Sequence, residues 1–118
     1  MEACNRGIFD EPIQVRELER YAADHGSRPM TTAPWRSQRI AIIGSGPAGL
    51  SAAYHLAKLG YLVTLFEAND ELGGVLRMGI PAYRLPRSVL EAEINYILDH
   101  GAIAHTGVRV DRKMLHQM

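Results

Sequence analysis

The sequence is 118 residues long, with 47% hydrophobic and 22% charged residues, which is the balance of a globular domain. Thirteen basic and thirteen acidic residues give a net charge of zero, so no basic surface for nucleic acid or anionic lipid is expected. The sequence has neither a run of about 18 apolar residues nor a signal-peptide core, so we expect no membrane segment. A single cysteine then predicts a cytoplasmic protein without an internal disulfide.

The first 38 residues predict a helix followed by a linker. Apolar residues recur at roughly helical spacing in IQVRELERYAAD, which predicts a helix over 11–23 with Pro12 in its first turn and Gly26 just beyond its end. Residues 28–38 (RPMTTAPWRSQ) hold two prolines and several small polar residues without periodicity, as expected of a linker. Trp35 is the residue of this stretch suited to anchoring it on a neighbouring surface.

The next part of the chain predicts alternating strands and helices. The apolar run 40–43 is typical of a parallel strand buried on both faces. A helix over 47–59 and a second buried strand over 61–66 follow, and two parallel strands joined by a helix form a right-handed βαβ unit. We then expect a helix over 87–100 and a β-strand or strand pair within 102–110.

The segment GSGPAG, between the first strand and its helix, fits G-x-G-x-x-G with Gly44, Gly46 and Gly49. The pattern is weak alone, but a preceding buried strand and a following helix are the context in which it binds a dinucleotide. Gly44 permits the tight turn, Gly46 the close approach of a pyrophosphate, and Gly49 the close packing of helix on strand. The start of the helix favours the anion, and Pro47 presets its first turn. The alternative is that the glycines only shape a turn.

A carboxylate ends the second strand. Glu67 stands about 20 residues beyond the glycine turn, where it would accept hydrogen bonds from the adenosine ribose and repel the 2′-phosphate of NADP. The alternative is a solvated charge at a strand end. The glycine pair Gly73–Gly74 follows and would let the chain approach the cofactor again, towards the second phosphate. This second approach favours FAD over NAD, and a flexible loop is its alternative.

The run GSGPAGLSAAYHLAKLGYLVTLFEANDELGGVLRMGIPAYRLPRSVLEAEI resembles the small subunit of glutamate synthase and its relatives, including the N-terminal electron-entry region of dihydropyrimidine dehydrogenase. The GGxLxxGIPxxRLP segment carries this resemblance more specifically than the glycines do. It implies an α/β fold, with 39–118 as the first part of a truncated, glutathione-reductase-like FAD-binding domain built on a Rossmann-type parallel βαβ unit. CNRGIFDEPIQVRELERYAAD is similar to the end of a helical domain with two [4Fe–4S] clusters, so 1–27 would be its remnant and 28–38 the linker.

The resemblance also implies a set of cofactor-binding residues. Residues 44–49 would hold the FAD pyrophosphate, Glu67 the adenosine ribose, and 73–75 the path towards the flavin. Arg84 would contact FAD, because its guanidinium offers a rigid fork of donors to phosphate oxygens. Val110, at the end of the last strand, would meet the adenine through its backbone. The full candidate set is Gly44, Ser45, Gly46, Pro47, Ala48, Gly49, Glu67, Ala68, Gly73, Gly74, Val75, Arg84 and Val110.

No catalytic or metal-binding residue is predicted. Cys4 matches the last cysteine of a cluster motif in the family, but a [4Fe–4S] cluster needs four ligands, so we expect no cluster here. Cys4 would be either an orphaned ligand or an ordinary free cysteine. The five histidines lack metal-ligand spacing, and there is no Cys-x-x-Cys pair or Ser/His/Asp arrangement.

The resemblance implies an oxidoreductase in which NAD(P)H reduces FAD and electrons pass through [4Fe–4S] clusters to a partner subunit or domain. In that family the NAD(P)H-binding segment follows the part covered here, so we expect the chain alone to be inactive. Its expected partner is a larger oxidoreductase subunit or a C-terminal half, with no nucleic acid or membrane involved. The alternative is a non-catalytic nucleotide-binding or interaction module that a partner chain completes.

Overall fold

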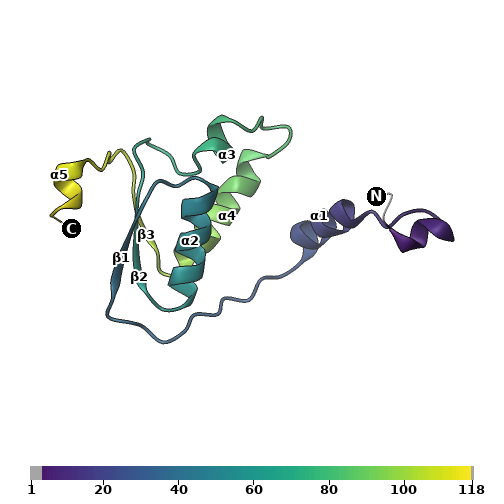
Figure 1. Cartoon of the computed structure of the whole chain (residues 1–118), viewed down its shortest axis with the longest axis horizontal. Coiled ribbons are helices and arrows are strands. Elements are labelled where there is room, and N and C mark those ends of the chain that lie inside the picture. The colour runs from purple at the N-terminus through teal and green to yellow at the C-terminus, as the bar shows by residue number, and fades with distance from the viewer. Residues whose placement is uncertain (1–3, 118) are drawn as a thin grey trace.

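The computed structural model describes residues 4–117, which form an α/β body with an N-terminal arm beside it (Figure 1). In chain order the elements are the 3₁₀-helix η1 (Asn5–Ile8), α1 (Val15–His25), β1 (Arg39–Ile43), α2 (Pro47–Lys58), β2 (Leu62–Phe66), α3 (Val75–Met78), α4 (Arg87–Asp99), β3 (Ile103–His105) and α5 (Arg112–Leu115). None of the helices among residues 4–117 has the length and apolar character needed to cross a bilayer.

The body is built on a parallel sheet in the order β1-β2-β3. Its register pairs Ile42 with Leu65 and Leu65 with Ala104. The helix α2 connects β1 to β2, which confirms the predicted βαβ unit. Because all three strands run in the same direction, their carboxyl ends meet at one edge of the sheet, where ligands bind in open α/β sheets.

The core lies between the sheet and the two longer helices of the body, α2 and α4. Leu65 is fully buried on β2, and Leu50 of α2 packs with it. Leu90 and Ile94 of α4 complete this cluster. A second cluster of smaller side chains, including Ala53 of α2, lets that helix lie close to the strands.

The opposite face of the sheet is open in the described part of the chain. Ile43 on β1 keeps 54% of its surface exposed, and Ile103 on β3 keeps 59%. Figure 1 shows both long helices of the body on one side of the strands. The prediction that the run 40–43 is buried on both faces is therefore wrong, because no element among residues 4–117 covers the second face.

The N-terminal arm, residues 4–25, extends away from this body. α1 has no buried residue and starts at Val15 rather than at residue 11, so Pro12 lies outside it and not in its first turn. It ends before Gly26, as predicted. The arm contributes to a radius of gyration of 18.0 Å, against about 13.5 Å for a compact domain of this length.

Residues 28–38 run past the C-terminal end of α2 and make several polar contacts with the body. The Arg28 guanidinium donates to both carboxylate oxygens of Glu93 on α4. Arg36 donates its backbone N–H and its Nε to carbonyl oxygens just after α2, at 2.8 and 2.9 Å. The Trp35 ring lies against Gly101, where an added Cβ would be 3.1 Å from it. Trp35 therefore does contact the body, although 69% of its surface is exposed.

The chain beyond α4 follows one of the two alternatives predicted for 102–110, a single β-strand, but that strand is short. Only Ile103–His105 form a strand within 102–110, so there is no strand pair in that range. The reason is Gly107, whose φ of +69° turns the chain away and whose N–H donates to the Asn69 carbonyl at 2.8 Å. Val110 consequently lies in a loop rather than at a strand end. The single-turn helices η1, α3 and α5 were not predicted.

Candidate functional site

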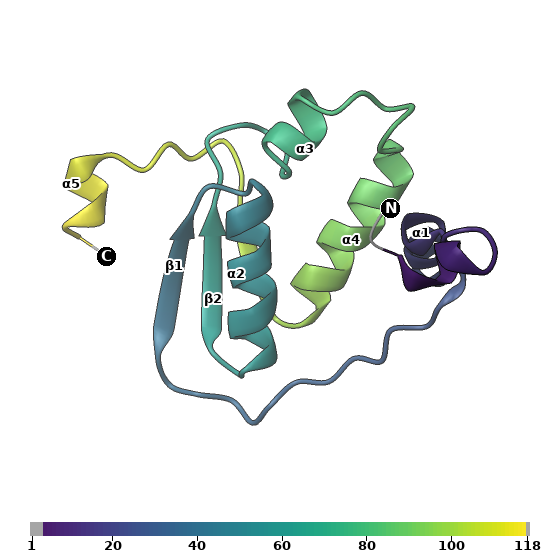
Figure 2. The ribbon, with the colours of Figure 1, turned by 45° about the vertical axis from the view of Figure 1, so that its right-hand side comes forward.

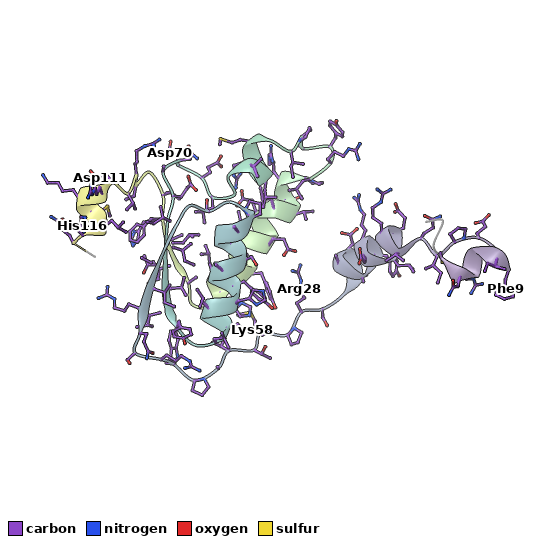
Figure 3. All side chains as sticks on the ribbon, viewed as in Figure 1. Phe9, Arg28, Lys58, Asp70, Asp111 and His116 are labelled. Carbon is purple, nitrogen blue, oxygen red and sulfur yellow. The ribbon has the colours of Figure 1, made fainter. Side chains whose placement is uncertain are left out.

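The candidate site residues gather where β1 and β2 end. Gly44 follows β1 directly, and Glu67 follows β2 directly. Figure 2 shows these two strand ends beside the first turn of α2, with α3 close by. Asp70 marks the same end of the sheet in Figure 3, and Lys58 the opposite end. The topology therefore brings the glycine turn, the carboxylate and the glycine pair together.

The three glycines of the turn differ in what the fold requires of them. Gly44 has a φ of +94°, a conformation that other residues rarely adopt. At Gly49 an added Cβ would overlap the carbonyl oxygen of Gly44 and lie 3.5 Å from a methyl group of Ile42. Gly46 has an ordinary extended backbone, with φ −67° and ψ −176°, and in the described part of the chain nothing except its chain neighbours lies within 4 Å of an added Cβ. The protein itself therefore leaves open the space above Gly46.

Helix α2 begins at this open space. Its N-cap residue is Gly46, which has no side chain to cap the first N–H groups of the helix. Pro47 occupies the first turn, as predicted. Ala48 is exposed. The first N–H groups of a helix lack intrahelical partners, and the helix dipole gives this end a partial positive charge. The N-terminal end of α2 is thus suited to binding an anion.

Glu67 is buried, with 6% of its surface exposed, and hydrogen-bond donors surround its carboxylate. Its Oε2 accepts from the N–H of Ser45 at 2.9 Å and from the Ser45 hydroxyl. Its Oε1 accepts from the N–H and the side-chain amide of Asn69, both at 2.9 Å. Burial alone would raise the pKa, but these hydrogen bonds outweigh it and lower the pKa of Glu67 to about 2. The group is a carboxylate at neutral pH.

Ser45 also joins the glycine pair to the glycine turn. Its hydroxyl accepts a hydrogen bond from the N–H of Gly73 at 3.1 Å, and Ser45 itself is fully buried. Gly73 and Gly74 have φ values of +120° and +50°. A Cβ on Gly74 would lie 3.0 Å from the Cα of Gly46, so the two glycine segments approach closely. The second approach predicted from the sequence is thus a feature of the fold.

A cavity of about 420 Å³ is lined in part by the residues that follow Glu67 in the chain, Asn69 among them. Ala68 lies on its wall, as do the acidic side chains of Asp70 and Glu71. Its volume falls within the range of small-molecule sites. With two carboxylates against one guanidinium, that of Arg77, its wall is acidic on balance and suits a neutral group better than a phosphate. The remaining lining residues are Asn69, Gly74, Arg77 and Met78.

Three predicted residues lie apart from this cluster of contacts. Val75 is the first residue of α3 and is 57% exposed. Arg84 is exposed, and no hydrogen bond or ion pair of its side chain occurs within residues 4–117. Val110 lies in the loop between β3 and α5. Among residues 4–117, none of the three makes a hydrogen bond to the glycine turn.

Sequence reasoning missed two residues that shape the site. Asn69 supplies two of the four donors to Glu67, and its position two residues beyond that acid was the available signal. Arg77 donates to the Leu72 carbonyl at 2.7 Å and to the carboxylates of Glu71 and Glu91. It thereby fixes the loop before the glycine pair to α4. An arginine inside the GGVLRMG segment was the signal for it.

Cys4 is a free cysteine next to η1 and is partly buried. Hydrogen bonds from backbone N–H groups, that of Ile13 foremost, lower the pKa of its thiol. Within residues 4–117 no three His, Cys, Asp or Glu side chains are grouped so that they could hold a metal ion.

The chain is similar to known proteins over most of its length. The family model described as an NAD(P)-binding Rossmann-like domain matches residues 42–117. The beta subunit of an NADP(+)-dependent formate dehydrogenase from Moorella thermoacetica is 44% identical over 92% of this chain and 19% of its own length. The NAD-dependent dihydropyrimidine dehydrogenase subunit PreT of Salmonella typhimurium is 44% identical over 83% of this chain and 25% of its length.

A glutamate synthase [NADPH] small chain from Mycobacterium tuberculosis is 34% identical over 92% of this chain and 23% of its length. Among solved structures, a 6-hydroxypseudooxynicotine amine oxidase from Pseudomonas geniculata is 28% identical and has a TM-score of 0.51, over 79% of this chain and 15% of its own. The chain thus spans a quarter or less of these relatives. The resemblance to glutamate synthase small subunits and dihydropyrimidine dehydrogenase is confirmed. The chain belongs to the family of NAD(P)-binding Rossmann-like domains.

Proposed function

We propose that the chain binds the ADP portion of FAD at residues 44–49 and Glu67, as part of an NAD(P)H-dependent flavoprotein oxidoreductase. The observation that carries this proposal is the open space at Gly46. The fold tolerates a methyl group there, since among residues 4–117 no atom beyond its chain neighbours lies within 4 Å of an added Cβ. A glycine that packing does not require, at the start of a helix, leaves room for a pyrophosphate.

Two further observations support FAD over the other dinucleotides. The ionised Glu67 and the acidic side chains of Asp70 and Glu71 would repel the 2′-phosphate of NADP. The glycine pair 73–74 returns to within contact distance of Gly46, as a cofactor that extends past its first phosphate would require. The family description names NAD(P), so FAD rests on these features of the chain itself.

When bound, FAD would accept a hydride from NAD(P)H and pass on its two electrons one at a time, with release of the proton. The residues of the chain itself would bind and orient the cofactor. The first turn of α2 would offset the pyrophosphate charge, and Glu67 would orient the ribose. Ser45 and Gly74 would keep the turn and the second segment in register.

The proposal extends to the whole protein through its relatives. Their names specify subunits of NADP(+)-dependent formate dehydrogenase, NAD-dependent dihydropyrimidine dehydrogenase and NADPH-dependent glutamate synthase. We therefore propose a cytoplasmic oxidoreductase in which a larger subunit or further segment binds NAD(P)H. The [4Fe–4S] clusters would belong to that assembly. Residues 1–27 would be the end of the helical cluster domain, 28–38 the linker, and 39–118 the first part of the FAD domain.

A titration of the purified chain tests the binding step. FAD, ADP, NAD⁺ and NADP⁺ are compared by calorimetry, and the flavin complex is followed by its visible absorbance. We expect FAD and ADP to bind more tightly than NADP⁺. Gly46→Ala should weaken both at least about tenfold, or about 1.4 kcal/mol, because the new methyl group would occupy the pyrophosphate position.

Gly7→Ala is the matched control, because its added Cβ would make only an ordinary contact, 3.4 Å from Pro12. It should bind FAD as the wild-type chain does. A wild-type chain that binds neither FAD nor ADP contradicts the proposal. So does a folded Gly46→Ala variant with unchanged affinity.

The open face of the sheet supports a second candidate function, an interaction module that a partner chain completes. Ile43 and Ile103 are more than half exposed on that face, whereas parallel sheets are ordinarily covered on both sides. The same titration separates the two candidates. A cooperatively folded chain with no affinity for any of the four nucleotides favours the interaction module.

A further inference from the structure

The two carboxylate oxygens of Glu67 lie in different surroundings. Oε2 faces the interior, where both of its hydrogen bonds come from the fully buried Ser45. Oε1 faces Asn69, in partly buried contacts. Asn69 is an exposed residue on the wall of the 420 Å³ cavity. Oε2 thus accepts from a buried residue, whereas Oε1 accepts from an exposed residue that lines the cavity.

The acceptor capacity of Glu67 is already filled. A carboxylate offers about four acceptor positions, and Ser45 and Asn69 supply two donors each. A ribose hydroxyl can therefore reach Glu67 only by replacing one of them. The two backbone N–H groups cannot leave without moving the chain.

The two side-chain donors differ in how freely they can leave. The Ser45 hydroxyl is fully buried and also accepts the N–H of Gly73, so its rotation would break two hydrogen bonds inside the protein. Within residues 4–117 the Asn69 side-chain amide makes a single hydrogen bond, to Glu67, and Asn69 lines the cavity. Its rotation would expose Oε1 without disturbing the backbone contacts of Asn69, which donates its N–H to Glu67 and accepts that of Gly107.

We infer that Asn69 is a specificity-determining residue whose side-chain amide occupies Oε1 of Glu67 until an adenosine ribose replaces it, while Ser45 anchors Oε2. This inference rests on the proposed nucleotide function and names the atom that takes the ribose. It requires that the two donors to one carboxylate affect ribose binding in opposite directions. Asn69 competes with the ribose, and Ser45 holds the carboxylate in place for it.

The test compares ADP with 2′,3′-dideoxy-ADP, which lacks both hydroxyls, by calorimetry on the full chain. Asn69→Ala should bind ADP about threefold or more tightly than wild type, because the ribose no longer displaces a hydrogen bond. Its affinity for dideoxy-ADP should stay unchanged, so the ratio of the two affinities rises. Ser45→Ala should bind ADP about tenfold more weakly, and its ratio should fall. Ser51→Ala, an exposed serine on α2, is the matched control.

A second measurement needs no nucleotide. Amide hydrogen exchange of Gly73 should accelerate in Ser45→Ala, because that N–H loses its acceptor. It should be unchanged in Asn69→Ala. This result separates the anchoring contact from the exchangeable one, and circular dichroism verifies that each variant is folded.

The outcomes distinguish this inference from the proposal on which it rests. A wild-type chain that does not bind ADP overturns both. A wild-type chain that binds ADP, with an Asn69→Ala variant whose ADP affinity is unchanged or weaker, overturns only the inference. If Ser45→Ala does not fold, the direction of the change in Asn69→Ala decides alone.

Discussion

The α/β body and the N-terminal arm use similar apolar residues to very different effect. In the body, Leu50 and Leu65 lose nearly all of their exposure between α2, α4 and the sheet. In the arm, Leu18 and Tyr21 remain 59% and 64% exposed on α1. Figure 3 shows Phe9 of the arm far from the strands, whereas Arg28 lies near the body. Helical periodicity is common to both regions, and only the body offers a surface on which to bury it.

An amphipathic pattern in the sequence can therefore belong to a helix that buries its apolar face, as α2 does, or to one that leaves it exposed, as α1 does. Burial of apolar area is the main favourable term in folding, so the body should carry the stability of residues 4–117. The arm should contribute little, since α1 has no buried residue. The following substitutions test this division, in order of decreasing effect on the free energy of unfolding.

Leu65→Ala should have the largest effect. Leu65 is fully buried between Leu50 and the α4 side chains, so truncation removes apolar contacts and leaves a cavity. We expect a loss of about 4 kcal/mol in the free energy of unfolding, measured by urea denaturation. Leu62→Ala on the open face of the same strand is the control and should cost much less. Equal losses at the two positions would contradict the view that one face of the sheet carries the core.

Gly49→Ala should destabilise the body by about 3 kcal/mol. The new methyl group would overlap the carbonyl oxygen of Gly44, which is backbone and cannot rotate away. Thermal unfolding followed by circular dichroism measures the loss. Gly46→Ala should leave the unfolding midpoint nearly unchanged, because its methyl group has no neighbour in the chain. A destabilised Gly46→Ala would show that this glycine serves the fold.

Glu67→Gln should destabilise the body at pH 7. It should also make the free energy of unfolding less dependent on pH, because the titrating carboxyl is removed. In the folded chain the pKa of Glu67 is about 2, below its ordinary value of 4.5, so the stabilisation is present above pH 4.5 and lost as the pH falls towards 2. The lowered pKa corresponds to roughly 3 kcal/mol. Urea denaturation at pH 7 and at pH 2.5 measures the free energy of unfolding of both proteins. The difference between wild type and variant should be smaller at pH 2.5 than at pH 7. Glu71→Gln, with an exposed carboxylate, should follow the wild-type profile.

Local patterns in the sequence predicted the body well. The β1–α2–β2 unit and α4 follow the predicted ranges within one residue at each end, because continuous apolar runs, a glycine turn and a helix stop are local signals. The three strands are parallel, as the alternation of strands and helices implied.

The remaining features depend on contacts between distant residues. The carboxylate of Glu67 accepts hydrogen bonds from Ser45, which is 22 residues away in the chain and lies beside it because β1 and β2 are paired. No local sequence pattern contains that pairing. The short β3 depends on Gly107 joining the loop after β2. The start of α1 was misplaced because Pro12 is compatible with a first turn but does not require one. Local patterns therefore specify elements, whereas the partners of polar groups come from the fold.

The smallest effect is expected in the arm. Leu18→Ala should change the free energy of unfolding of the body by less than about 0.5 kcal/mol, because the side chain keeps most of its exposure in the folded chain. Leu50→Ala on α2 is the matched control, since the same truncation at 5% exposure should cost several times more. Urea denaturation of both variants measures the contrast. A Leu18→Ala variant that loses as much stability as Leu50→Ala would mean that α1 packs against the body in solution, and the separation between arm and body would then be wrong.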